Sequence, residues 1–90
     1  MKQQRIVYFS GRVQGVGFRF TACRAAMGFD VTGCVKNLPD GRVQCLIEGE
    51  EKEIDAFLEE LERRMRGYIR HTTQQSAPPS GRWESFDVGH

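Results

Sequence analysis

The sequence predicts an α+β sandwich in which an antiparallel sheet of four or five strands carries two helices on one face. Two segments place their apolar residues at helical spacing, so each has one face to bury. The remaining regular segments are short and rich in β-branched and aromatic residues, which favours strands. Along the chain these segments follow the order strand, helix, strand, strand, helix, strand, with a further short strand at the end.

The predicted strands are bounded by residues that break regular structure. A Leu-Pro-Asp-Gly turn at residues 38–41 separates the second strand from the third, as expected for a hairpin. A Pro- and Ser-rich stretch at residues 76–81 precedes the last strand. The five predicted strands are residues 5–10, 32–37, 42–48, 68–75 and 82–88.

The two predicted helices each have an apolar stripe and a polar face. The first begins at Phe18, and the second covers residues 52–66 and ends before Gly67, a common helix terminator. Apolar residues on one face of the first helix are Phe18, Ala22, Ala25, Ala26 and Phe29, and those of the second are Ile54, Phe57, Leu58, Leu61 and Met65.

A single domain covering residues 1–90 accommodates this order of elements. With both helices on one face of the sheet, both stripes are buried through short connections, which gives the ferredoxin-like α/β sandwich (βαββαβ plus a short C-terminal strand). That fold supports many unrelated functions, so function has to be argued from a site.

Composition excludes several classes of protein. Ninety residues with 13 basic and 12 acidic side chains give 13 − 12 = +1, without the basic excess of a dedicated nucleic-acid binder. No apolar run approaches the roughly 20 residues that span a bilayer. The first residues lead directly into a predicted strand and contain neither the apolar h-region nor the small-residue cleavage site expected of a signal peptide. We therefore expect a cytoplasmic protein that binds neither nucleic acid nor membrane, with a monomer as the default state.

The cysteines and histidines form no familiar metal-binding pattern. Cys23, Cys34 and Cys45 are spaced by 11 residues without a CxxC pair, and His71 and His90 complete no ligand set. If residues 38–41 close the hairpin with Asn37 opposite Arg42, Cys34 lies opposite Cys45. A cross-strand disulfide is then conceivable, although reduced thiols are expected in a cytoplasm.

A glycine-rich loop between the first strand and the first helix is the most informative segment. Glycines let backbone N–H groups converge on one concavity, and the start of a helix at Phe18 adds unpaired donors and the positive end of a dipole. Arg19 can fold back and hold an oxyanion with two hydrogen bonds. The loop is neither a Walker A loop nor a dinucleotide fingerprint, and a tight strand-to-helix connection explains its glycines equally well without a ligand.

Asn37, at the end of the second strand, is the second candidate. Its carboxamide both donates and accepts hydrogen bonds, so it can orient a water molecule. An Asn at a strand end also commonly helps to start a turn, so the position alone does not decide between the two interpretations.

Taken together, these two segments resemble the acylphosphatase family. The sequence GRVQGVGFR at residues 11–19 is similar to that family's signature loop, and GCVKNLPDG at residues 33–41 is similar to its second motif. The resemblance implies hydrolysis of the carboxyl-phosphate anhydride bond of small acyl phosphates, without metal or organic cofactor. It implies that inorganic phosphate is the product or an inhibitor.

The resemblance also implies roles for individual residues. Arg19 matches the phosphate-binding arginine, and Asn37 matches the asparagine that orients the attacking water. The phosphate cradle is then formed by Gln14, Gly15, Val16, Gly17, Phe18 and Arg19, mainly through backbone amides.

Three alternative functions fit the sequence less well. RNA binding requires stacking aromatics on the third strand, which has none. A cysteine phosphatase requires its thiol ahead of the phosphate loop, whereas Cys23 follows Arg19 within a helix. The third alternative is a non-catalytic anion- or phosphate-binding module of the same family, for which the intact Arg19 and Asn37 would have no catalytic use.

Overall fold

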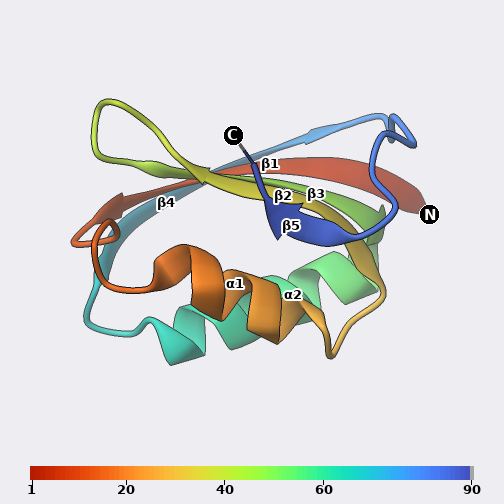
Figure 1. Cartoon of the computed structure of the whole chain (residues 1–90). Helices are drawn as coiled ribbons and strands as arrows, with labels where there is room; N and C mark the ends of the chain where they lie inside the picture. The colour runs from red at the N-terminus through yellow and green to blue at the C-terminus, as the bar shows by residue number, and fades with distance from the viewer. Residues whose placement is uncertain (90) are drawn as a thin grey trace.

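A computed structural model describes residues 1–89 of the chain as a five-stranded sheet with both helices packed against one face (Figure 1). His90, for which the sequence predicts no ligand role, lies outside the described residues. The elements are β1 (Lys2–Gly11), α1 (Phe18–Ala26), β2 (Val31–Asn37), β3 (Val43–Glu50), α2 (Glu51–Arg64), β4 (Ile69–Ala77) and β5 (Phe86–Val88). The predicted ferredoxin-like α+β fold is therefore confirmed.

The strands lie in the order β4-β1-β3-β2-β5. β1 is antiparallel to both β3 and β4, and β2 is antiparallel to β3. β5 pairs in parallel with β2, which corrects the expectation of a wholly antiparallel sheet. The reason is topological, because the connection from β4 stays at one end of the sheet (Figure 1) and β5 must run back from that end, in the direction of β2.

Two elements are shorter than the sequence predicts. β5 covers only Phe86–Val88 rather than residues 82–88. α1 ends at Ala26, and the next residues form a tighter turn in which the amide of Phe29 donates to the carbonyl of Ala26 at 3.1 Å. Phe29 nevertheless packs toward Phe57, with ring centroids 6.3 Å apart. The apolar stripe thus continues into the core beyond the end of the helix.

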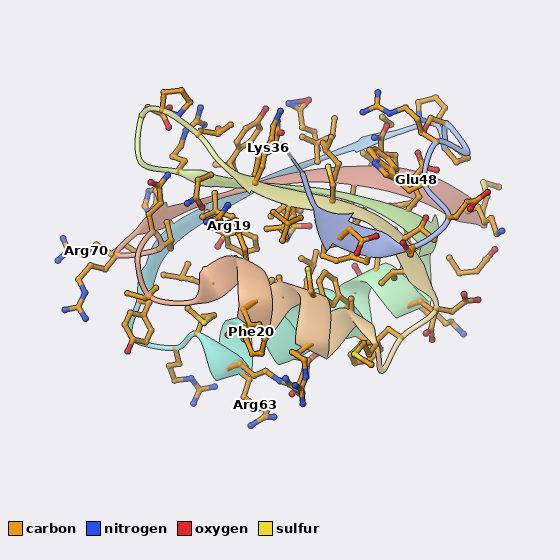
Figure 2. All side chains as sticks on the ribbon, in the orientation of Figure 1. Arg19, Phe20, Lys36, Glu48, Arg63 and Arg70 are labelled. Carbon is orange, nitrogen blue, oxygen red and sulfur yellow. The ribbon has the colours of Figure 1, made fainter. Side chains whose placement is uncertain are left out.

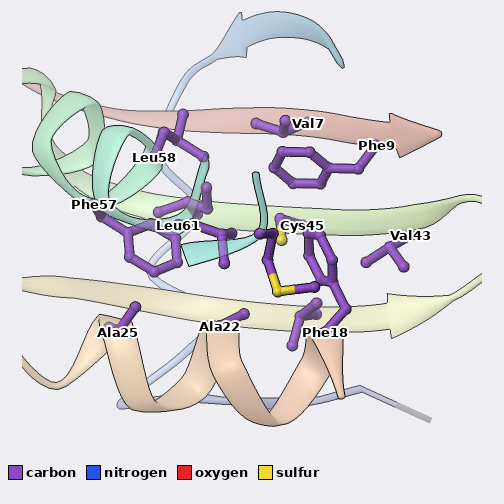
Figure 3. Close-up of a cluster of buried hydrophobic side chains, with 14 of the residues drawn as sticks. Val7, Phe9, Phe18, Ala22, Ala25, Val43, Cys45, Phe57, Leu58 and Leu61 are labelled. Atoms are coloured by element: carbon purple, nitrogen blue, oxygen red, sulfur yellow. The ribbon is translucent and has the colours of Figure 1, made fainter. Parts of the chain in front are cut away.

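The core lies between the sheet and the two helices (Figure 3). Alternate residues of β1 and β3 face the helices and are fully buried, as a half-covered sheet requires. Both predicted helical stripes contribute to the core, which contains Val7, Phe9, Val13, Phe18, Ala22, Val35, Val43, Cys45, Ile47, Ile54, Phe57 and Leu61 among its buried residues.

The β2–β3 hairpin differs from the predicted register by one residue. Leu38 faces Arg42, with the amide of Leu38 donating to the carbonyl of Arg42 at 2.8 Å, and Asn37 pairs with Val43. Gly41, at φ +97°, is the extra residue of a three-residue loop and allows this bulged closure. Cys45 consequently pairs with Val35 and faces the core, while Cys34 lies on the opposite face of the sheet. This geometry rules out the Cys34–Cys45 disulfide, and both thiols are free.

A buried carboxylate fixes the connection from β4 to β5. Glu48 of β3 is only 6% exposed and accepts hydrogen bonds from the amide and hydroxyl of Ser80, both at 2.6 Å, and from the amide of Gly81 at 2.9 Å. Burial opposes ionisation of Glu48, but these hydrogen bonds outweigh it and hold the pKa of the carboxyl below its usual range. The connection therefore returns to a fixed place beside β2, where β5 can pair.

Candidate active site

The two segments singled out by the sequence meet at one end of the sheet. β1 and β2 run in the same direction with β3 between them, so the loop after β1 and the turn after β2 lie at the same end (Figure 1). A cavity of about 560 Å³ opens there, a size suited to small-molecule ligands. Its lining consists of Val13, Gly15, Gly17, Phe18, Arg19, Phe20, Cys23, Asn37 and Val88.

Residues 12–18 are anchored at both ends, so the loop between β1 and α1 has a fixed shape. At the start, the amide of Arg12 donates to the carbonyl of Tyr68 at 2.8 Å, and Val13 is fully buried. At the end, the ring of Phe18 packs on that of Phe9, with centroids 5.0 Å apart. The glycines between these anchors are exposed and face the cavity.

Gln14 connects the loop to the β2–β3 hairpin. Its Nε2 atom donates to the carbonyl oxygens of Leu38 at 2.8 Å and of Arg42 at 2.9 Å. Those two residues face each other directly beyond Asn37, so the carboxamide closes the hairpin onto the loop. The family resemblance places Gln14 in the phosphate cradle through its backbone amide, and no sequence pattern predicts this role for its side chain.

The N-terminus of α1 has the properties of an anion site. Gly17 occupies the N-cap position at φ +77°, so no side chain caps the helix, and the first turn carries no acidic residue. Within residues 1–89, the amides of residues 14–20 donate no hydrogen bond to another group of the protein. Unpaired amides at a helix start, together with the helix dipole, attract a negative charge.

Arg19 adds a full positive charge to this end of α1. It lies in the first turn of the helix and, in Figure 2, between the helix and the sheet. Its guanidinium forms no ion pair and no hydrogen bond with any residue in the part of the chain that the structure describes. The group is exposed and lines the cavity, so its donors are available to an oxyanion.

Asn37 lines the same cavity from the side of the sheet. It is the last residue of β2, half-buried, and its pairing with Val43 holds its backbone in place. Its carboxamide forms no hydrogen bond with other side chains or backbone groups among residues 1–89. A rigidly placed carboxamide without a protein partner is suited to holding a water molecule.

The structure thus brings most of the predicted site together. Of the predicted residues, Gly15, Gly17, Phe18, Arg19 and Asn37 line the cavity. Val16 instead packs against the core, and the side chain of Gln14 binds the hairpin. Four further residues line the cavity without having been predicted from the sequence, namely Val13, Phe20, Cys23 and Val88.

Spacing along α1 offers a signal for one of these additional residues. Cys23 follows Arg19 by four positions, which places both on one side of the helix. Burial, and to a lesser extent the charge of Asp87, raises the pKa of the Cys23 thiol. The thiol is therefore protonated at neutral pH and unsuited to act as a nucleophile. Val88 gives no comparable signal, because only the folded position of β5 brings it to the cavity.

Residues 1–89 contain no group of three or more His, Cys, Asp or Glu side chains placed to hold a metal ion. Neither helix in these residues has the length and apolar character to cross a membrane.

Comparison with known proteins identifies the family. Residues 5–88 match the Acylphosphatase family. The acylphosphatase of Archaeoglobus fulgidus is 54% identical over 52 residues, which cover 58% of each protein, so the chain spans little more than half the length of this curated relative. The crystal structure of acylphosphatase from Bacillus subtilis superposes with a TM-score of 0.86 at 32% identity over the whole of both chains. HypF from T. kodakarensis is 34% identical with a TM-score of 0.81, covering 99% of this chain and 12% of that one. The chain therefore belongs to the acylphosphatase family.

Proposed function

We propose that this protein is an acylphosphatase that hydrolyses the carboxyl-phosphate anhydride bond of small acyl phosphates without a metal ion or organic cofactor. One observation carries the proposal, namely that a single cavity holds the uncapped start of α1, the unpaired Arg19 and the unpartnered carboxamide of Asn37. Membership of the acylphosphatase family supports the same reaction.

Binding of the phosphoryl group falls to the loop and Arg19. The amides of the cradle, from Gln14 to Arg19, would donate to the equatorial oxygens, while the guanidinium of Arg19 would hold two of them. These donors are fixed before substrate arrives, since Val13 and Phe18 anchor the loop in the core. Donors fixed in this way stabilise charge in the transition state without reorganisation.

Asn37 would place the attacking water. The water oxygen attacks phosphorus in line with the scissile P–O bond, that bond breaks, and the electron pair leaves with the acyl carboxylate. The water proton passes to a phosphoryl oxygen of the substrate itself, which yields inorganic phosphate. A carboxylate leaves without needing a proton, so the reaction requires no general acid, and positioning with charge stabilisation is sufficient.

Steady-state hydrolysis of benzoyl phosphate in the presence of EDTA tests the proposal. Arg19→Ala should lose about 10²–10³ in kcat and bind phosphate more weakly, because a fixed charged donor to the transition state is removed. Asn37→Ala should lose turnover but keep its affinity for phosphate. Arg70→Ala is the matched control, since Arg70 on β4 is exposed and points away from the molecule (Figure 2).

The outcomes separate hydrolysis from binding alone. Turnover that survives chelation and collapses only in the two site variants establishes the proposed reaction. A folded wild-type protein that phosphate protects against heat but that shows no turnover is instead a non-catalytic anion-binding module. Strong activity in Asn37→Ala contradicts the water-positioning role.

A further inference from the structure

We infer that the cavity contains a separate subsite for the acyl group, formed chiefly by Phe20 with Cys23 beside it, and that it favours aromatic acyl phosphates. The inference rests on the proposed function for the position of the phosphoryl group. It adds a class of preferred substrate and a specificity-determining residue.

The cavity is larger than the phosphoryl group requires. Its volume of about 560 Å³ is in the range of pockets that hold whole small molecules, whereas the phosphoryl group is only phosphorus and its oxygens. The polar side chains Arg19 and Asn37 account for the anion, and the other side chains of the lining are apolar, with Phe20, Cys23 and Val88 joining the buried Val13 and Phe18. The space next to the anion site is therefore walled by apolar groups.

Among these apolar groups, Phe20 lies in the direction in which the leaving group departs. Asn37 lies on the sheet, at the end of β2, while Phe20 lies on the side of α1 that faces away from the sheet (Figure 2). An in-line displacement places the leaving group opposite the attacking water. With the water at Asn37 and phosphorus at the start of α1, the acyl carboxylate leaves away from the sheet, toward Phe20.

Phe20 has features that packing does not explain. Its side chain is 68% exposed, so it contributes little to the core. The guanidinium of Arg24, one turn later, lies 5.7 Å from the ring centroid and forms a cation–π contact with the ring. An exposed aromatic ring beside an anion site is suited to offset or edge-to-face contact with a second ring.

Two pairs of probes with equal charge test the inference. The first compares kcat/KM for benzoyl and acetyl phosphate, and the second compares the binding of phenylphosphonate and methylphosphonate by calorimetry. In Phe20→Ala the preference for the aromatic member of each pair should fall about threefold to tenfold, the contribution of one aromatic contact. Phe20→Tyr should restore the preference because it restores the ring.

Met27→Ala is the control, since Met27 is the C-cap residue at the far end of α1, is 81% exposed and does not line the cavity. It should leave both ratios unchanged. Unchanged ratios in Phe20→Ala, or an equal change in Met27→Ala, would overturn the acyl subsite. A wild-type protein that hydrolyses neither substrate contradicts the proposed function, and the phosphonate comparison then still decides whether the subsite exists.

Discussion

Replacement of Gln14 by Leu should uncouple the phosphate loop from the hairpin that carries Asn37. The change removes both hydrogen bonds from Nε2, to the carbonyls of Leu38 and Arg42, at nearly constant side-chain size. Two neutral hydrogen bonds contribute about 1–3 kcal/mol. Each carbonyl keeps a backbone partner, because Gly41 also donates to Leu38 and Leu38 to Arg42. The loss should therefore be about 1–2 kcal/mol, or roughly 5–15 °C in Tm.

The effect on catalysis should be larger than the effect on phosphate binding. A displacement of about 1 Å between water and phosphorus can cost about 10²-fold in rate. We expect kcat to fall about 10- to 100-fold. The substitution keeps the backbone amide of residue 14 and leaves Arg19 unchanged, so the affinity for phosphate should change by less than about threefold. Thermal unfolding, steady-state hydrolysis of benzoyl phosphate and phosphate inhibition measure these three quantities.

Gln44→Leu is a matched control for this variant. Gln44 on β3 donates one hydrogen bond to the hydroxyl of Tyr8 at 3.1 Å, outside the cavity. This variant should lose stability without losing kcat. If kcat of Gln14→Leu stays at the wild-type value, or if Gln44→Leu loses kcat to the same degree, the carboxamide of Gln14 does not position Asn37.

Three further predictions concern the rest of the molecule. Glu48→Gln should cost about 1–3 kcal/mol at pH 7, since it removes the charge from the hydrogen bonds with Ser80 and Gly81. The folded-state pKa of Glu48 is depressed, so its stabilisation is present above the carboxyl's ordinary pKa and is lost as pH falls through the folded pKa. Urea unfolding of the wild type and of Glu48→Gln should therefore show the difference in their free energies of unfolding shrinking from neutral to acidic pH. A difference that stays constant with pH would contradict this role of the Glu48 carboxylate. Treatment with diamide should give no intramolecular Cys34–Cys45 disulfide by mass spectrometry, because the two side chains lie on opposite faces of the sheet. Finally, kcat/KM should decrease with added NaCl, because salt screens the attraction between the anionic substrate and the unpaired guanidinium at the site; a value independent of salt would contradict this.

The order of elements was predictable because local signals agree along this chain. Helical stripes, strand-like segments and breakers each specify the same arrangement, and the structure places both stripes in one core. The direction of β5 was not predictable in the same way. It depends on where the preceding connection is held, and Glu48 holds it through Ser80 and Gly81, residues more than thirty positions away in the chain.

The register of the hairpin shows a second limit of sequence reasoning. Leu-Pro-Asp-Gly predicts a turn, but it does not reveal whether Gly41 belongs to the turn or forms an extra bulged residue. The choice moves every pair by one position and decides whether Cys34 faces Cys45. Because strand side chains alternate, a shift of one residue moves the two thiols to opposite faces.

The candidate site was partly predictable for a different reason. Gly17 and Arg19 lie in one continuous segment, so their joint contribution to an anion site follows from local geometry. The side-chain amide of Gln14 donates hydrogen bonds to carbonyls 24 and 28 residues away in the chain, and no local sequence pattern indicates these partners. Val88 enters the cavity from the last strand for the same kind of reason.

The proposed mechanism divides the work between the backbone and a few side chains. Most donors to phosphate would be amides of the loop and of the first turn of α1, and substitutions at the surface of the loop do not remove them. Among side chains, only Arg19 and Asn37 would then touch the reacting atoms, while Gln14 would set the distance between them. Because the amides remain in every variant, loss of Asn37 should leave a protein that still binds phosphate, whereas loss of the anchors Val13 or Phe18 should weaken binding and turnover together. Catalysis in so small a domain would therefore depend on how rigidly the fold holds one loop against one hairpin.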